Sequence, residues 1–240
     1  MRLLDLTLTT PEENLALDEA LLEEAETSPA TVETLRLWEP TGPLVVIGRG
    51  SQLAVEVNQR VCQAEPGVPI LRRTSGGASI VTGPGCLMYA VVLSYISRPE
   101  LRSIDEAHAF VLGSIAASLT TRVPGVSRRG ISDLTLGDQK FSGNSLRCKQ
   151  RTLLYHGTLL YDFPLELVGR YLNMPPRVPD YRAGRTHAEF IANLPISREA
   201  LVTALVAAFK AEETRDSWPR ELTSRLAAEK YSRLEWNQQR

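Results

Sequence analysis

The sequence has few cysteines and no cysteine pair spaced for a redox or metal site. Its three cysteines, Cys62, Cys86 and Cys148, are an odd number without a CxxC step. A secreted disulfide scaffold has a denser and even set, so this content favours a reducing compartment, and we expect a cytoplasmic protein. The three histidines show no metal-ligand spacing with one another or with the cysteines.

The chain also lacks a long apolar run and an excess of charge of either sign. Acidic residues at Asp5, Glu12 and Glu13 interrupt the N-terminal region before any apolar core of signal-peptide length. The longest apolar stretch, near residues 87–93, is too short to span a bilayer. With 27 Lys and Arg against 28 Asp and Glu, the net charge is −1. We therefore expect neither a nucleic-acid nor a membrane partner.

The composition is that of a globular chain. Of its 240 residues, 43% are hydrophobic and 23% are charged, which excludes a disordered chain and a coiled coil. No internal repeat, low-complexity tract or linker interrupts the sequence. We expect one mixed α+β domain over residues 1–240.

Apolar residues at helical spacing predict helices, and β-favouring runs between turn residues predict strands. The first helix has Thr10 as a candidate N-cap, Pro11 at its first position and Glu13 three residues after the cap. The proline-rich residues 174–179 predict an extended connection. The predicted helices are residues 11–24, 103–120, 164–171, 198–212 and 221–231. The predicted strands are residues 34–38, 44–47, 68–72, 80–81, 87–94, 132–136, 140–146, 152–155 and 158–161.

Two arginines followed by a glycine-rich loop form the first candidate site. The loop lacks the GK[ST] ending of a P-loop and the GxGxxG spacing of a dinucleotide fold. Arginine donors and closely approaching backbone N–H groups suit a phosphate or a carboxylate. The alternative is a tight turn with solvated arginines. The segment comprises Arg72, Arg73, Thr74, Ser75, Gly76, Gly77, Ala78 and Ser79.

A lysine and a histidine mark two further candidate sites. Lys140 lies between turn-prone segments, near the predicted start of the return strand of a hairpin whose first strand is residues 132–136. There it can neutralise a carboxylate and the phosphate that the carboxylate attacks, or it can be an ordinary exposed lysine. His156 and Gly157 interrupt a β-favouring run, and a glycine at such a place often marks a bulge or a close approach to a ligand. Alone, His156 is expected to be a hydrogen-bonded structural histidine.

Covalent catalysis has less support from the sequence. No GxSxG elbow is present, so serine-hydrolase chemistry is not favoured. Cys148 lies between Arg147 and Lys149, and a nearby cation can activate a thiol. The default interpretation of both Cys148 and Cys86 is nevertheless an inert thiol.

Taken together and in order, these motifs resemble the lipoate–protein ligase A family of the biotin/lipoate A/B protein ligase superfamily. The resemblance covers about residues 1–195, which is the catalytic domain only, and leaves a helical segment at 196–240. The motifs that carry it are Arg72-Arg73-Thr74-Ser75-Gly76-Gly77, then Asp133, then Lys140-Phe141-Ser142-Gly143-Asn144-Ser145, and then His156-Gly157-Thr158-Leu159-Leu160 with Asp162.

The resemblance implies a mixed central β-sheet flanked by helices, with an acyl tunnel beside a nucleotide pocket. It implies activation of lipoate, or octanoate, by ATP and Mg²⁺ to an acyl adenylate, without a tightly bound prosthetic group. The acyl group then passes to a lysine of a lipoyl carrier domain, either a 2-oxoacid dehydrogenase E2 or the glycine cleavage H protein.

The same resemblance assigns roles to residues. Lys140 is the catalytic residue, which binds the substrate carboxylate and then the bridging acyl-phosphate oxygen. Arg73 and the backbone of residues 76–78 hold the adenylate, and Asp133 is a candidate contact for Mg²⁺ or for the acceptor lysine. The full set of expected binding residues is Arg72, Arg73, Ser75, Gly76, Gly77, Ala78, Ser79, Ile80, Val81, Asp133, Ser142, Gly143, His156 and Gly157.

The sequence departs from the family pattern at four places. Thr82-Gly83 stands where a His-Asp pair is expected, Ala78 replaces a glycine, Cys86 an asparagine and Ser132 the asparagine of an Asn-Asp step. The accessory domain of many full-length ligases is also missing from these 240 residues. Three alternatives stay open: a ligase with a separate accessory protein, an octanoyl or lipoyl transferase that needs no ATP, and a non-catalytic acyl- or carrier-binding relative.

Overall fold

An eight-stranded mixed sheet forms the centre of the computed structural model, which describes residues 1–64 and 66–239. The strand order is β11-β1-β2-β6-β10-β9-β8-β7, and a second sheet has the order β4-β3-β5. The strands are β1 Arg2–Asp5, β2 Thr34–Trp38, β3 Leu44–Ile47, β4 Ile70–Arg72, β5 Ile80–Thr82, β6 Cys86–Ser94, β7 Val126–Arg129, β8 Asp133–Leu136, β9 Gln139–Cys148, β10 Thr152–Leu160 and β11 Glu213–Thr214.

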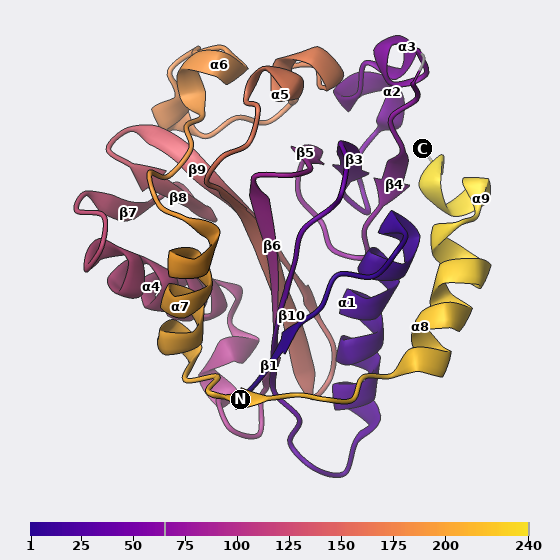
Figure 1. Cartoon of the computed structure of the whole chain (residues 1–240), viewed down its shortest axis with the longest axis vertical. Helices are drawn as coiled ribbons and strands as arrows, with labels where there is room; N and C mark the ends of the chain where they lie inside the picture. Colours follow the sequence, from indigo (N-terminus) through magenta and orange to yellow (C-terminus); the bar gives the residue numbers. More distant parts are fainter. Residues whose placement is uncertain (65, 240) are drawn as a thin grey trace.

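Helices cover both faces of the large sheet, which confirms the predicted fold class. Figure 1 shows α4 and α7 on one side of β6 and β10, with α1 and α8 on the other. The α-helices are α1 Pro11–Thr27, α2 Leu53–Glu56, α3 Gln59–Cys62, α4 Ile104–Thr120, α5 Glu166–Tyr171, α6 His187–Phe190, α7 Arg198–Phe209, α8 Arg220–Leu226 and α9 Leu234–Asn237. Single turns of other helix types are η1 Pro99–Arg102, η2 Asp180–Arg182 and η3 Ala227–Tyr231.

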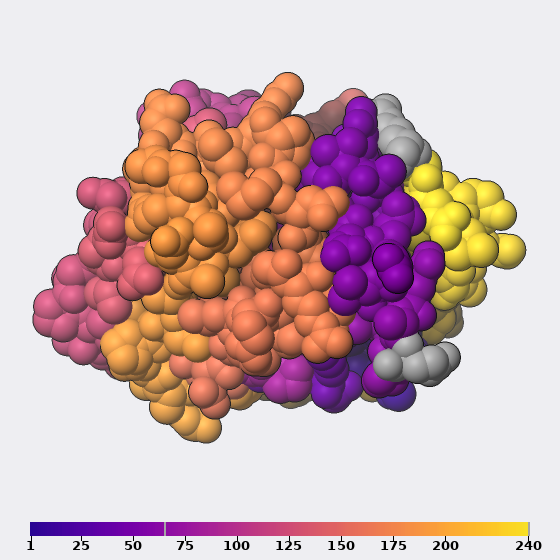
Figure 2. Space-filling model, turned by 90° about the horizontal axis from the view of Figure 1, so that it is seen from above, coloured from indigo at the N-terminus to yellow at the C-terminus, as the bar shows by residue number. Residues whose placement is uncertain are grey.

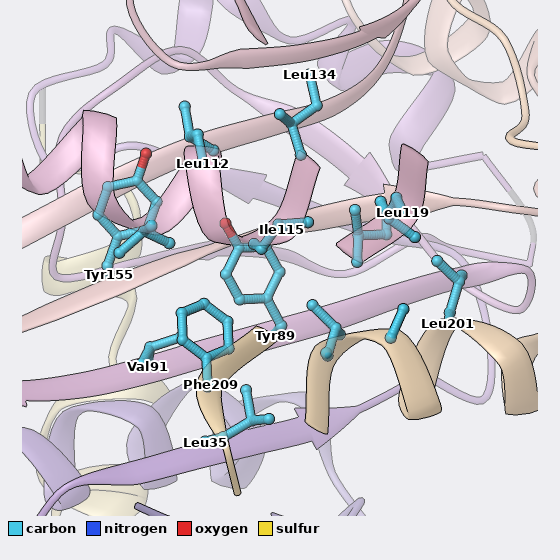
Figure 3. Packing of buried hydrophobic residues seen from close by; sticks show 14 of the residues in the cluster. Leu35, Tyr89, Val91, Leu112, Ile115, Leu119, Leu134, Tyr155, Leu201 and Phe209 are labelled. Atoms are coloured by element: carbon cyan, nitrogen blue, oxygen red, sulfur yellow. The ribbon is translucent and has the colours of Figure 1, made fainter. Parts of the chain in front are cut away.

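The alternation of side chains along the strands divides the core into two layers. On β6, Tyr89 and Val91 point toward α4 and α7, where Leu112, Ile115 and Phe209 pack against them (Figure 3). The intervening residues of β6 face α1 and the small sheet. Because β6 is buried along its whole length, both layers exclude water from the centre of the sheet.

The start of α1 confirms the predicted capping box. The hydroxyl oxygen of Thr10 accepts a hydrogen bond from the Glu13 N–H, and the Glu13 carboxylate accepts one from the Thr10 N–H. Pro11 takes the first helical position, where no donor is needed. Among the described residues, no helix is long and apolar enough to cross a membrane.

The predicted interruption at His156 and Gly157 is wrong, because residues 152–160 form one continuous strand, β10. Glycine is required there by a close approach from the neighbouring strand. A Cβ atom on Gly157 would lie 1.9 Å from Asn144 Oδ1 and 2.9 Å from the Gly143 carbonyl oxygen. The unusual residue therefore marks close packing of β9 against β10, not the end of a strand.

Two C-terminal helices end earlier than predicted. Helix α7 stops at Phe209 because Lys210 adopts a left-handed conformation with φ 51°. The predicted helix at 221–231 begins at Arg220 and changes at Ala227 into a π-helical turn. Seven short elements were not predicted, since a hydrophobic period does not develop over so few residues. They are β1, β7, β11, α2, α3, α6 and α9. The equally short β3, β4 and β5 were predicted, because β-favouring residues and neighbouring turn residues mark them.

A buried ion pair joins α1 to the sheet. Arg36 of β2 is fully buried, and its Nη1 lies 2.5 Å from Asp18 Oδ1. Asn14 adds two acceptors, its backbone carbonyl and its side-chain oxygen, each 2.7 Å from the guanidinium. Burial raises the pKa of Asp18, but Arg36 and His156 outweigh burial and hold that pKa below its ordinary value of 3.8.

Replacing Arg36 with methionine is expected to lower the free energy of unfolding by about 3–5 kcal/mol, because Asp18 is left buried without its partner. Urea denaturation at neutral pH measures this loss. The control is Arg198→Met, which breaks partly exposed pairs with Asp5 and Glu39 and should cost less than about 1 kcal/mol per pair. Equal losses in the two variants would contradict the assignment of a structural role to the buried pair.

Candidate functional site

A cavity of about 1170 Å³ brings most of the predicted site residues together. Its lining comes from the loop after β4, from β9 and β10, from α2 and from residues 176–181. The volume exceeds that of most single-ligand pockets, so the cavity has room for two ligand parts. The predicted residues that line it are Arg73, Gly76, Gly77, Ala78, Ser79, Ile80, Asp133, Lys140, Gly143, His156 and Gly157.

The covering side of the cavity is formed by segments far apart in sequence. In Figure 2 the purple segment that carries α2 and α3 lies against the orange segment that follows α5. An isolated β-bridge between Val57 and Leu172 joins them, and the Asn173 N–H donates to the Glu56 carbonyl oxygen. The connection at 174–179 contains no helix or strand, but it bends at residues 176 and 177, so the prediction of an extended connection holds only in part. Residues 176–179 of it line the cavity.

Four predicted residues lie outside the cavity lining. Val81 is packed in the core, and Ser142 is buried with its hydroxyl bonded to Asn144. Ser75 lies beneath the glycine-rich loop. Arg72 is fully buried, and its guanidinium donates to the carbonyl oxygens of Gly48, Arg49, Ser51, Trp236, Asn237 and Gln239.

The second arginine shapes the glycine-rich loop from within. Arg73 Nη2 lies 2.6 Å from the Gly76 carbonyl oxygen and 2.9 Å from that of Ala78. Burial lowers the pKa of Arg73 to about 10, although the negative charge of Glu56 opposes this shift. Gly77 has φ +85°, a conformation that favours glycine, and a Cβ there would lie 2.9 Å from Arg73 Nη2. The guanidinium therefore fixes the loop while also lining the cavity.

The catalytic candidate Lys140 lines the cavity and is paired with a carboxylate there. It is the second residue of β9, as the predicted hairpin requires, and its Nζ lies 2.7 Å from Asp133 Oδ1. The Tyr181 hydroxyl donates to Asp133 Oδ2 at 2.7 Å. Burial and the neighbouring Asp133 carboxylate raise the pKa of Tyr181, so the phenol stays protonated. Gly143 leaves room for Lys140, since a Cβ there would lie 3.0 Å from Nζ.

His156 connects the buried ion pair to the glycine-rich loop. Its Nε2 lies 2.5 Å from Ser75 Oγ, and its Nδ1 lies 3.6 Å from Asp18 Oδ2. Arg73 Nε donates to the same Ser75 oxygen at 3.1 Å. The histidine is thus a hydrogen-bonded residue that also borders the cavity, which combines the two interpretations that the sequence allowed.

Glu56 and Tyr181 line the cavity and make hydrogen bonds within it, but neither was among the predicted binding residues. Glu56 is buried, and its carboxylate accepts hydrogen bonds from the Ser79 N–H at 2.7 Å and the Ser79 hydroxyl at 2.8 Å. Tyr181 anchors Asp133 from the single turn η2. Both lie in very short helices, where periodicity gives no signal. Their only sequence cue is a polar or aromatic side chain near a predicted motif.

The structure does not offer Asp133 as a ready ligand for Mg²⁺. Both of its carboxylate oxygens are engaged, one by Lys140 and one by Tyr181. Within residues 1–64 and 66–239, no group of three or more His, Cys, Asp or Glu side chains is placed to hold a metal ion. Because Mg²⁺ in nucleotide sites keeps several waters and binds mostly to phosphates, a dedicated protein cage is not required.

The three cysteines lie away from the cavity. None of them is among the described residues that line it. Burial raises the pKa of Cys86 to about 12 and also raises the pKa of Cys62. Cys148 is exposed at the end of β9.

Sequence comparison places these features among known proteins. The lipoyl protein ligase A/B catalytic domain matches residues 10–210 of the chain. A protein of Aeropyrum pernix, named as a lipoate-protein ligase A, is 34% identical over 152 residues, which cover 63% of this chain and 54% of that protein. The chain therefore spans about half the length of this relative.

Solved structures share the fold over nearly the whole chain. A bi-partite lipoate protein ligase from Thermoplasma acidophilum, described with its E2 lipoyl domain, matches with a TM-score of 0.82 and 22% identity, covering 99% of this chain and 95% of that one. A lipoate-protein ligase A bound with ATP matches with a TM-score of 0.77 and 24% identity, covering 99% and 98%.

Iodoacetamide at about pH 8 is expected to alkylate Cys148 and to spare Cys62 and Cys86 in the folded protein, because only an exposed thiol that forms thiolate reacts. Peptide mapping by mass spectrometry locates the adduct. The Cys148→Ser variant should show no adduct until it is unfolded in urea. Modification of folded Cys86 at the same rate as Cys148 would contradict the burial that the structure assigns to it.

Proposed function

The chain belongs to the lipoyl protein ligase A/B catalytic-domain family, and on that basis we propose that it activates lipoate with ATP to lipoyl-AMP and transfers the lipoyl group to a lysine of a carrier domain. The observation that carries this proposal is the placement of Lys140. Its ammonium group lies in one cavity with the glycine-rich loop and with an apolar end made by Leu15, Val46 and Met88.

The two ends of the cavity suit the two parts of an acyl adenylate. The apolar end suits the acyl chain, because burying each methylene there is favourable. The glycine-rich loop, shaped by Arg73, presents backbone between Gly76 and Ala78 to the nucleotide. Lys140 borders the cavity beside Gly143. From there its positive charge would neutralise a carboxylate that is joined to the nucleotide phosphate.

In the first half-reaction a lipoate carboxylate oxygen attacks the α-phosphorus of ATP. The new bond joins that oxygen to phosphorus, and the bond to pyrophosphate breaks with its electron pair leaving on pyrophosphate. Lys140 neutralises first the carboxylate and then the bridging oxygen, and it moves from Asp133 to do so. Mg²⁺ held by the ATP phosphates and water would screen the phosphate charge, without a dedicated set of protein ligands among the described residues.

In the second half-reaction the amine of the carrier lysine attacks the acyl carbonyl carbon. An amide bond forms, the bond from that carbon to the AMP oxygen breaks with its electron pair leaving on AMP, and the proton of the amine passes to solvent water. Asp133 is placed to receive the incoming ammonium group once Lys140 has turned to the adenylate, since its oxygens already bind a cation and a phenol.

The partner is a lipoyl carrier domain, either of a 2-oxoacid dehydrogenase E2 or of the glycine cleavage H protein. Support comes from the Thermoplasma acidophilum structure, whose description includes an E2 lipoyl domain and a ligase in two parts. A separate accessory protein is therefore part of the proposal. The free thiols of all three cysteines agree with a cytoplasmic location.

The alternatives use the same cavity with different chemistry. A transferase of the superfamily needs a thioester-forming cysteine, and Cys148, the exposed candidate, is not among the described residues that line the cavity. Mass spectrometry tests the transferase alternative: an acyl-enzyme that is lost in the Cys148→Ser variant would support it. Retained transfer activity in that variant would refute a Cys148 mechanism. A non-catalytic relative has no need of the Lys140–Asp133 pair, and turnover that depends on Lys140 excludes it.

Replacing Lys140 with alanine is expected to lower lipoate-dependent pyrophosphate release by about a hundredfold to a thousandfold, because charge that develops at the acyl phosphate loses its donor. Purified protein, lipoate, ATP and Mg²⁺ are assayed with and without a carrier domain and an accessory protein. The matched control is Lys149→Ala, which removes a lysine paired with Glu23 outside the cavity lining and should retain activity. No release by the unmodified protein under any of these conditions would overturn the ligase proposal.

A further inference from the structure

The last residues of the chain form a strap along the outer edge of the small sheet. The strap, residues 230–239, contains the end of η3 and helix α9. Figure 1 shows α9, in yellow, beside β4. The strap lies outside the region that matches the family, which ends at residue 210. None of its residues is among the described residues that line the cavity. An effect of the strap on the chemistry therefore passes through the residues that it contacts.

Two side chains of the strap bind the backbone of Arg72 at the end of β4. The order β4-β3-β5 places β4 at an edge of its sheet. Asn237 Oδ1 accepts a hydrogen bond from the Arg72 N–H at 2.9 Å, and the indole N–H of Trp236 donates to the Arg72 carbonyl oxygen at 2.7 Å. These side chains supply the hydrogen bonds that a further strand would supply at this edge. They thereby fix the point where the glycine-rich loop begins.

The side chain of Arg72 extends this contact to a turn beside the loop, residues 48–51. Its guanidinium donates to the carbonyl oxygens of Gly48 and Ser51 at 2.8 and 2.9 Å, as well as to carbonyl oxygens of the strap. The Ser51 hydroxyl donates to the Gly77 carbonyl oxygen at 3.2 Å. A Cβ on Gly48 would lie 1.9 Å from that same oxygen, so the turn and the loop are in direct contact. Arg72 therefore joins the strap to a turn that borders the loop.

A second contact reaches the loop through Glu19 of α1. Lys230 Nζ lies 2.8 and 2.7 Å from the two Glu19 carboxylate oxygens, and the Tyr231 hydroxyl donates to one of them at 2.8 Å. The Thr74 hydroxyl, two residues after the end of β4, donates to the other at 3.3 Å. Lys230 Nζ also lies 4.1 Å from the centre of the Trp236 ring. Both contacts with the start of the loop thus belong to one packed unit.

We propose that the strap holds the glycine-rich loop in the conformation that receives the nucleotide, and that Trp236 and Asn237 are positioning residues for ATP. The inference rests on the proposed use of this loop for ATP. When a loop leaves its binding conformation, the apparent affinity falls in proportion to the fraction that remains competent. The effect is specific to the nucleotide, since among the described residues no hydrogen bond or ion pair joins the strap to β8 or β9, which carry Asp133 and Lys140.

The test compares ATP binding with lipoate binding, each measured by calorimetry on the full chain in the presence of Mg²⁺. Asn237→Leu keeps the approximate size of the side chain and removes its acceptor. Its Kd for ATP is expected to rise by at least about tenfold, as when about a tenth of the loops stay competent, while its Kd for lipoate stays within about twofold. Asn237→Asp retains the acceptor and should recover most of the ATP affinity. Trp236→Phe removes the indole donor and should also raise the Kd for ATP.

Thr223→Val is the matched control. Thr223 is also buried in the C-terminal region, and its hydroxyl donates to the Pro219 carbonyl oxygen at the start of α8. Its loss should lower stability and leave the Kd for ATP unchanged. Amide hydrogen exchange supplies a second measurement. Residues 73–79 should exchange faster in Trp236→Phe, while β10 stays as protected as in the unmodified protein.

The outcomes separate the inference from its premise. A rise in Kd shared equally by ATP and lipoate overturns the inference, because it marks general loosening of the fold. Unchanged ATP binding in folded Asn237→Leu and Trp236→Phe overturns it as well. If Asn237→Leu does not fold, unchanged exchange of residues 73–79 in Trp236→Phe has the same consequence, and so does an unmodified protein that binds no nucleotide. ATP binding that depends on Asn237 without pyrophosphate release would support the strap while refuting the ligase.

Discussion

The buried ion pair between Asp18 and Arg36 is the interaction on which the other features of the site depend. Two buried charges at the interface between a sheet and a helix are tolerated only when their remaining hydrogen-bonding groups have partners. Each residue that supplies such a hydrogen bond is thereby held in place, together with the element that carries it. Asn14 ties the pair to the start of α1, and His156 ties it to β10. Through Ser75, His156 then positions the glycine-rich loop, while Arg36 backs the ring of Trp38. One pair thus supports both the glycine-rich loop and the ring of Trp38.

The loop is anchored a second time by the C-terminal segment. Asn237 Oδ1 accepts a hydrogen bond from the Arg72 N–H, and Trp236 Nε1 donates to the Arg72 carbonyl oxygen. Lys230 bonds to Glu19 of α1, which also accepts from the Thr74 hydroxyl. The strand end and the loop that follows it are therefore set by residues more than 150 positions away in sequence. Local sequence rules carry no information about such contacts.

The regular elements and the position of Lys140 could be predicted because their signals are local. A capping box, a hydrophobic period or a turn between two β-favouring runs each acts within a few residues. Arg72 and Arg73 show where prediction from local signals fails. Both look equally suited to an anion, but Arg72 is used to bind distant carbonyl oxygens, and only Arg73 reaches the cavity. The prediction at Gly157 was wrong for a similar reason. The atom that leaves no space for a Cβ there is Oδ1 of Asn144, which lies on another strand.

Thr82 and Gly83 stand where the family pattern has a His-Asp pair, and the structure shows what these two residues contact. Thr82 is fully buried, and neither residue is among those that line the main cavity. The Thr82 hydroxyl instead lies 3.2 Å from the Met88 sulfur, and a Cβ on Gly83 would lie 3.3 Å from the Gly42 carbonyl oxygen. These positions thus contact Met88 of β6 and the turn before β3, and they are separate from the Lys140–Asp133 pair. Because Met88 lines the main cavity, a change at Thr82 acts on the apolar part of the lining and leaves the Lys140–Asp133 pair in place.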